Sequence, residues 1–139
     1  MICEGVLICN MLIGGVTYHF TDKYAPENGY NWNNQTIGVE IGTKINETKI
    51  NLHSVIFKDS YFKRSQTHGL AVTEKIFEKT YGGITIDYTK TSYFEHALLA
   101  PVISREINVK KKAGEIYLMG LPPMGNNDGF INVGLKVRF

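Results

Sequence analysis

The stretch INVGLKVRF, residues 131–139, decides how this chain folds. Its apolar and polar residues alternate without a break, with Ile131, Val133, Leu135, Val137 and Phe139 set against Asn132, Gly134, Lys136 and Arg138. Successive side chains of a β-strand point to opposite faces, so this alternation predicts a strand with one apolar side.

The same period of two recurs along most of the chain. TIGVEIG (36–42), KINLHSVIF (49–57) and ITIDY (84–88) repeat the alternation. Four further strands are predicted at 5–20, 68–77, 102–109 and 114–121, which brings the total to eight. Residues 69–79 also fit a short helix, so that segment keeps two interpretations.

The connections between these strands are of two kinds. Longer polar segments follow the first, third, fifth and seventh strands, at 21–33, 59–67, 90–96 and 122–128. Short turns follow the second, fourth and sixth strands, at 44–48, 80–83 and 110–113. An up-and-down meander therefore has all long loops at one rim and all short turns at the other. It most simply closes into a barrel, because closure removes both exposed edges.

Two kinds of barrel fit this pattern. A soluble lipocalin-like calyx has its apolar residues inside, whereas an outer-membrane barrel has them outside, and alternation alone does not identify the inner face. The even strand number, the two kinds of connection and the terminal Phe139 are typical of outer-membrane barrels. An aromatic girdle is expected at the long-loop rim from Tyr18, Phe20, Tyr24, Tyr30, Trp32, Tyr61, Phe62, Tyr93 and Phe94. We therefore predict an all-β, eight-stranded antiparallel up-and-down barrel of the outer-membrane type, with the calyx as the alternative.

Size, charge and cysteines limit the function classes. The 139 residues are expected to form a single β-barrel domain, 1–139, and the net charge of +2 without a basic face argues against nucleic acid as a partner. Cys3 and Cys9 are expected on one strand, about 20 Å apart, which is too far for a disulfide. No signal peptide is recognisable in this sequence. If the protein is exported, we expect that this chain lacks its signal peptide.

The long-loop rim is where chemistry is expected. His19 ends the first predicted strand, and Asp59 and Ser60 end the third, so all three approach this rim. A Ser hydroxyl becomes a good nucleophile when a base takes its proton, His is the usual base, and a carboxylate can orient the imidazole. His19, Asp59 and Ser60 are the candidate catalytic residues, and the alternative is that Asp59 and Ser60 only bond to nearby backbone in a turn. The spacing of the four histidines predicts no metal site, and no cofactor is expected.

Several segments together resemble the lipid A palmitoyltransferase (PagP-type) family of outer-membrane barrels. They are FKDSY (57–61), TYHF (17–20) followed by YNWN (30–33), YFEHALLAPVIS (93–104) and the closing YLMGLPPMGNNDGFINVGLKVRF (117–139). In that family an Asp-Ser pair on the third strand and a His on the first are required for acyl transfer, which implies the same roles for Asp59, Ser60 and His19. The arginine that the family has in its first loop is replaced here by Trp32 and Asn33. The helix that precedes the family's barrel is not expected within these residues, unless it was lost with a missing N-terminus.

The resemblance implies an enzyme that moves or cleaves a fatty acyl ester of phospholipid or lipid A. It also implies a monomer in the bacterial outer membrane, with phospholipid, lipopolysaccharide and the membrane itself as partners. A phage-encoded relative fits the same features. The rival hypotheses are a non-enzymatic outer-membrane barrel that binds a partner or alters the host envelope, and a soluble calyx that binds a small molecule.

Overall fold

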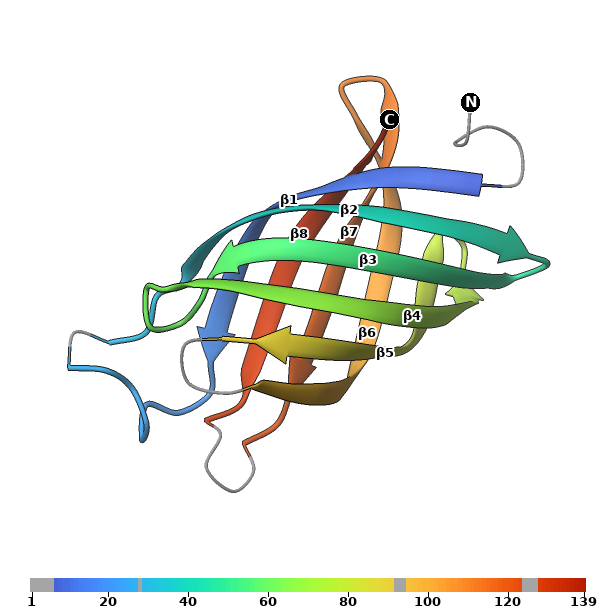
Figure 1. The fold of residues 1–139 in the computed structure, drawn as a ribbon. Coiled ribbons are helices and arrows are strands. Elements are labelled where there is room, and N and C mark those ends of the chain that lie inside the picture. Colours follow the sequence, from blue (N-terminus) through green and yellow to red (C-terminus); the bar gives the residue numbers. More distant parts are fainter. Residues whose placement is uncertain (1–6, 28, 92–94, 124–127) are drawn as a thin grey trace.

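Eight antiparallel strands close into a barrel in the computed structural model, which describes residues 7–27, 29–91, 95–123 and 128–139, residue 96 by its backbone only (Figure 1). The strands are β1 (Leu7–His19), β2 (Asn33–Ile45), β3 (Thr48–Lys58), β4 (Arg64–Phe77), β5 (Thr80–Lys90), β6 (Glu95–Val109), β7 (Lys112–Leu121) and β8 (Phe130–Arg138). Each strand pairs with its neighbour in sequence, and β8 closes the sheet onto β1. The predicted eight-stranded up-and-down barrel is confirmed.

The barrel is apolar outside and polar inside. The side chains of Val39, Leu52, Ile86 and Leu99, on four different strands, are each about half exposed on the outer wall. In β8 the alternating stretch has Lys136 buried in the lumen between outward-facing Leu135 and Val137. Burying lysine while exposing aliphatic side chains is the reverse of a soluble calyx and matches the outer-membrane type of barrel. Separately, the described part of the chain contains no helix that is long and apolar enough to cross a membrane.

The connections follow the predicted division into two rims, with two corrections. β4 begins at Arg64, so the third connection covers only 59–63 and the predicted loop at 59–67 was too long. The β4–β5 turn lies at Glu78 and Lys79, whereas the predicted turn residues Gly82 and Gly83 lie within β5. The alternative of a helix at 69–79 is wrong, because this segment is strand as far as Phe77. The long connections gather at the lower left of Figure 1.

The aromatic residues near the long-loop rim divide into two groups. Tyr18, Phe20, Trp32 and Phe62 are exposed, as a girdle requires. The side chains of Tyr24, Tyr30 and Tyr61 instead line the mouth of the lumen, so the girdle prediction was wrong for these three. Tyr93 and Phe94 lie outside the described residues. The inward tyrosines belong to the site described below.

The start of β1 differs from the sequence-based interpretation. The described strand begins at Leu7, and Cys9 on it is disulfide-bonded. The exclusion of a disulfide was therefore wrong, because it assumed one continuous strand from Cys3 to Cys9. Cys3 itself lies outside the described residues.

Candidate functional site

His19 and Ser60 meet at the mouth of the lumen. His19 is the last residue of β1, and Ser60 is in the turn after β3, forty-one residues later. The Nε2 atom of His19 lies 2.8 Å from the Ser60 hydroxyl oxygen, which is hydrogen-bond distance. The up-and-down topology brings these two residues together, as their positions at the ends of the first and third strands predicted.

The turn that carries Ser60 is shaped by Asp59. Its Oδ1 accepts hydrogen bonds from the backbone N–H groups of Tyr61 (2.9 Å) and Lys63 (3.0 Å), and its Oδ2 accepts one from the Ser65 hydroxyl (2.7 Å). The backbone N–H of Asp59 also donates to the carbonyl of Lys63 over 2.7 Å. This is an Asp-centred turn that reverses the chain within five residues. Because the chain turns here, the Ser60 side chain reaches the lumen although Asp59, its neighbour, is also buried.

The ring of His19 is oriented by a backbone carbonyl. Its Nδ1 atom lies 3.1 Å from the carbonyl oxygen of Gly129, just before β8. A carbonyl oxygen only accepts, so Nδ1 carries the proton, and Nε2 of the neutral ring is free to accept from the Ser60 hydroxyl. The proposed contact of Asp59 with His19 therefore needs correction: Gly129 occupies the nitrogen that a catalytic carboxylate would hold. His19 has the tautomer that a general base for Ser60 requires.

Gly129 is needed at this position for two reasons. Its φ of +71° lies in the left-handed region, where residues with a side chain are strained. A Cβ at Gly129 would also lie 2.6 Å from the backbone nitrogen of Pro123, in the preceding loop. A glycine therefore lets the two sides of this connection approach closely and presents its carbonyl to His19.

The Tyr30 ring packs against one face of the His19 imidazole. The two rings are stacked, with centroids 3.7 Å apart and planes inclined by 23°. The Tyr30 hydroxyl donates to Oδ2 of Asp128, which also accepts from the backbone N–H of Tyr24 at 2.8 Å. Thr21 donates to the other oxygen, Oδ1, of Asp128. Asp128 thus ties the β1–β2 loop to the end of the β7–β8 connection around the His19 ring.

The charge of Asp128 is held by these contacts. Burial favours its neutral form, but the hydrogen bonds from Thr21, Tyr30 and Tyr24 outweigh burial and lower the pKa of the Asp128 carboxyl. Burial and then the bond to Asp128 raise the pKa of the Tyr30 hydroxyl, so Tyr30 stays a neutral donor. Asp128 also interacts electrostatically with His19. It is the carboxylate in a position to stabilise a positive charge on that ring.

A cavity of about 470 Å³ opens below the His19–Ser60 pair. Both residues line it, together with Asp59 and Asp128. Deeper apolar lining residues are Leu12, Val55, Phe57, Ala71, Leu98 and Met119. The volume is within the range of small-molecule sites, about 300–1,000 Å³, so one extended apolar chain fits beneath the reactive pair.

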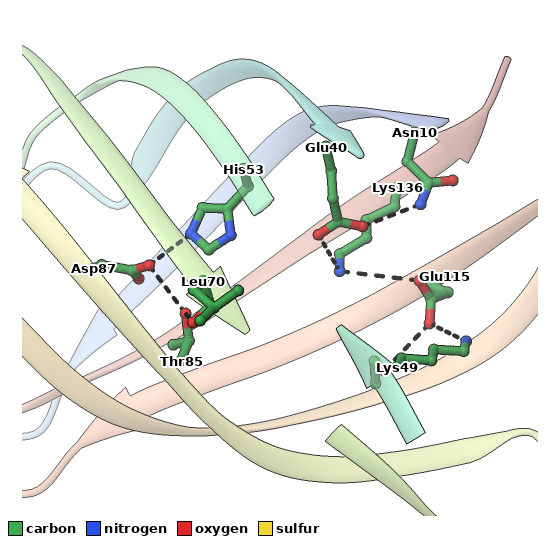
Figure 2. Close-up of polar contacts among 10 residues, drawn as sticks. Asn10, Glu40, Lys49, His53, Leu70, Thr85, Asp87, Glu115 and Lys136 are labelled. Atoms are coloured by element: carbon green, nitrogen blue, oxygen red, sulfur yellow. Dashed lines mark hydrogen bonds and ion pairs between the residues drawn. The ribbon is translucent and has the colours of Figure 1, made fainter. Parts of the chain in front are cut away.

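Charged side chains close the lumen towards the short-turn rim. Lys49 lies 2.9 Å from both Glu106 and Glu115, and Lys136 lies 2.8 Å from Glu40. Figure 2 shows that Glu115 connects the two lysines, with Lys136 at 3.9 Å from its second oxygen. These side chains come from five strands, so the network ties opposite walls together and forms a floor.

A second cluster of polar side chains lies in the lumen, nearer to the long-loop rim than the floor network. His53 Nε2 is 2.6 Å from Oδ1 of Asp87, which also accepts a hydrogen bond from Thr85 at 2.9 Å (Figure 2). His53 and Asp87 line the same cavity as Ser60. The lining therefore combines apolar side chains with polar ones from several strands.

The hydrogen-bond ladder between β6 and β7 is incomplete at its long-loop end. Pairing of these strands runs from Val102–Met119 to Val109–Lys112, so it stops below the long-loop rim. The next β6 residue is Pro101, which has no N–H to continue the ladder. An apolar pocket of about 500 Å³ lies on the outer wall at this seam. It shares Val102 and Phe130 with the lumen cavity, so these side chains lie between the two spaces.

Sequence reasoning missed three features of the site. Asp128 was placed only at the end of a loop, Gly129 was not singled out, and Tyr30 was assigned to the girdle. The contacts of Asp128 and Gly129 with the first loop and β1 span 98 and 110 residues, which no local pattern encodes. The Asp-Gly order before the last strand was the one available signal, because it is typical of a tight turn.

Comparisons with known proteins give a likeness of fold alone. No protein-family model matches the chain, and no curated protein matches it. A similar solved structure is that of Ail, the attachment invasion locus protein of Yersinia pestis, determined in complex with the heparin analogue sucrose octasulfate. It is 14% identical over 98% of this chain and 99% of that chain, with a TM-score of 0.42.

Proposed function

We propose that this barrel lies in the bacterial outer membrane and moves or cleaves a fatty acyl ester of phospholipid or lipid A. The contact that supports the proposal most is the 2.8 Å approach of His19 Nε2 to the Ser60 hydroxyl, directly above a cavity. The apolar outer wall supports the membrane location, because exposed Leu, Ile and Val side chains on all sides are stable in lipid. The resemblance of FKDSY and TYHF to acyltransferase segments supports the reaction class.

In the first half-reaction Ser60 attacks the carbonyl carbon of the donor ester. His19 Nε2 takes the hydroxyl proton as the new carbon–oxygen bond forms. The tetrahedral intermediate then collapses, the donor's ester bond breaks, and His19 returns the proton to the departing alcohol. The acyl group is left as an ester on Ser60.

In the second half-reaction a hydroxyl of the acceptor attacks that ester. His19 again takes the proton and then gives it to the Ser60 oxygen, which restores the free enzyme. A lipid A hydroxyl as acceptor gives acyl transfer, and water gives hydrolysis. The acyl chain occupies the lumen cavity during both steps, against apolar lining residues such as Leu12, Val55 and Met119.

The two carboxylates at the mouth have different roles in this mechanism. Asp59 is a positioning residue, because its three hydrogen bonds fix the turn that holds Ser60. Asp128 stabilises the imidazolium that forms on His19 when it takes the proton, since it interacts electrostatically with the ring and holds Tyr30 against it. Gly129 fixes the tautomer.

The seam between β6 and β7 is the proposed route for the acyl chain. The chain of a membrane lipid is already in the hydrocarbon layer, so a lateral opening spares it a passage through water. The apolar pocket at Pro101 touches the lumen cavity through Val102 and Phe130, which supports this route.

The test is mass analysis of phospholipid and lipid A from cells that express the wild type, Ser60→Ala or His19→Ala. We expect an added or removed acyl chain with the wild type only, because a missing nucleophile or base typically costs several orders of magnitude in rate. Ser104→Ala is the matched control, since Ser104 is a buried serine that donates to Glu115 at the floor, away from the mouth, and should leave the reaction unchanged. Acyl changes that persist in Ser60→Ala would contradict the proposed mechanism.

The second candidate is a non-enzymatic barrel that binds a partner through its rim. The carbonyl of Gly129 in place of a carboxylate on His19 favours it, because such a pair also serves as a purely structural contact. Lipids that are identical with and without wild-type expression, under conditions where the barrel is folded in the membrane, would favour this candidate.

A further inference from the structure

The outer face of β3 and β4 departs from the rest of the apolar wall. Arg64, Gln66 and His68 are exposed at successive outward positions of β4, followed by Leu70 and Val72. On the adjacent strand, Lys58 and Ser54 are the register partners of Arg64 and His68. On β3 the exposed Ile56, the partner of Gln66, lies between Lys58 and Ser54, so the continuous polar track runs along β4 and has polar partners on β3 at its two ends.

The same level on the opposite side of the barrel is apolar. Outward residues of β1 and β8 pair there as Tyr18 with Ile131 and Val16 with Val133. Polar side chains that face hydrocarbon are costly unless they have partners. The track on β3 and β4 is thus a local exception that calls for a partner outside the protein.

The contacts within this track leave some of its hydrogen-bonding atoms available to a ligand outside the protein. Ser54 and His68 contact each other through Oγ and Nδ1 at 2.7 Å. That contact leaves Nε2 of His68 for an external donor or acceptor. At the rim the Lys58 ammonium lies 5.9 Å from the centre of the Phe62 ring, so an aromatic surface flanks the two cations of this pair of strands.

The order of these groups matches the order of groups in a phosphate-bearing lipid. Such a lipid has its phosphate outermost, its ester or amide carbonyls below, and its hydrocarbon chains below those. Outward positions follow each other every ~6.6 Å along a strand, or about 5 Å in depth at a tilt of ~40°. Lys58 and Arg64 are at phosphate level, Gln66 and His68 are at carbonyl level, and Leu70 is in the hydrocarbon.

We propose that the outer face of β3 and β4 is a docking site for lipid A. The long loops of outer-membrane barrels face the outside, so the track lies in the outer leaflet, where lipid A supplies phosphate groups and amide-linked and ester-linked acyl chains. Arg64 and Lys58 bind a phosphate, and Gln66 and His68 bind the carbonyl or hydroxyl groups of the acyl linkages. The proposal rests on the membrane placement of the proposed function, not on acyl transfer.

The test is native mass spectrometry of the full chain in detergent, titrated with lipid A, with phosphatidylglycerol or with diacylglycerol. We expect one lipid A bound preferentially, phosphatidylglycerol bound more weakly and diacylglycerol not retained. Removal of both cations in Lys58→Gln/Arg64→Gln should weaken lipid A binding about 25-fold, at roughly fivefold for each basic residue. Lys110→Asn/Lys111→Asn removes two charges at the other rim and should leave lipid A binding unchanged.

His68→Leu is the second variant, because an apolar residue on the lipid-facing wall does not threaten folding. It should weaken lipid A binding several-fold. Ser60→Ala should bind lipid A as the wild type does, whether or not it transfers acyl chains, which separates this proposal from the proposed function. Unchanged binding in both β3–β4 variants, equal binding of phosphatidylglycerol, or dimers that replace the lipid would each overturn the assignment.

Discussion

The two ends of the lumen hold their polar groups in opposite ways. Towards the short-turn rim, Lys49, Glu115 and Lys136 satisfy one another in a network that ties strands together. At the long-loop rim, His19 and Ser60 contact each other beside an open cavity, and the groups that hold them come from connections rather than strands. In the first arrangement, charged side chains pair with one another and close the lower end of the lumen. The second leaves a base and a hydroxyl exposed to whatever enters the cavity.

Stability and chemistry therefore depend on opposite ends of this barrel. A network of buried ion pairs rigidifies the lower barrel, because removing one partner leaves the others uncompensated. The upper site depends on loop residues such as Asp128, which can be changed without touching the floor. The predictions below test that separation.

The largest expected effect on stability is at the floor. Lys49→Met leaves Glu106 and Glu115 without their common cation, and loss of one member of a buried pair costs about 3–5 kcal/mol. Urea unfolding of the purified barrel in detergent micelles measures the change. The folded fraction should still form the His19–Ser60 contact and should keep acyl-transfer activity.

The matched control for this variant is Lys75→Met, because Lys75 and Glu47 form an exposed pair at 3.7 Å. Exposed pairs contribute about 0–1 kcal/mol, so this variant should unfold close to the wild type. Equal stability of Lys49→Met and Lys75→Met would show that the floor network does not stabilise the barrel.

The period and the order of the strands predicted one residue of the floor and two residues of the mouth. Alternation in residues 131–139 marked Lys136 as sharing a face with Asn132, and closure of the barrel then required one of the two faces to be buried. The positions of His19 and Ser60 at the ends of two strands followed from the same topology. These predictions needed only the period of the strands and their order.

Other parts of the site depend on geometry that no period encodes. Asp59 was expected to contact His19, but the chain reverses so tightly after β3 that its carboxylate is used within the turn. Asp128 and Gly129 reach the site because the last connection folds back over the first loop. Such contacts are set by the conformations of loops, and loop conformation is weakly coupled to residue pattern.

The second-largest loss of stability is expected at the turn that carries Ser60. Asp59→Asn removes the charge from an acceptor of three hydrogen bonds, and bonds to charged groups contribute about 1.5–3 kcal/mol each in favourable settings. We expect a loss of about 1–3 kcal/mol in urea unfolding, together with a lower kcat. Ser65→Ala removes one of the three bonds and should lose less of both.

This pair of variants distinguishes positioning from direct catalysis by Asp59. If Asp59 acts only by holding the turn, the fall in kcat should follow the fall in stability across Ser65→Ala and Asp59→Asn. A complete loss of activity in Asp59→Asn with unchanged stability would instead assign Asp59 to the chemistry and contradict its role in the turn.

The smallest effect is a pH dependence confined to the mouth of the barrel. The folded-state pKa of Asp128 is depressed below its unfolded value of about 3.9, because hydrogen bonds from Thr21, Tyr30 and Tyr24 outweigh its burial. A depressed carboxyl pKa contributes stability that is present above the unfolded pKa and lost as the pH falls through the folded pKa. Wild type should therefore melt above Asp128→Asn at pH 8, the margin should widen where His19 takes up a proton, because Asp128 favours the charged ring, and it should close below about pH 4. Because both proteins share every floor carboxylate, their difference in melting temperature reports Asp128 and its contacts, and a margin that persists undiminished to pH 3 would mean that the loop is not held by its charge.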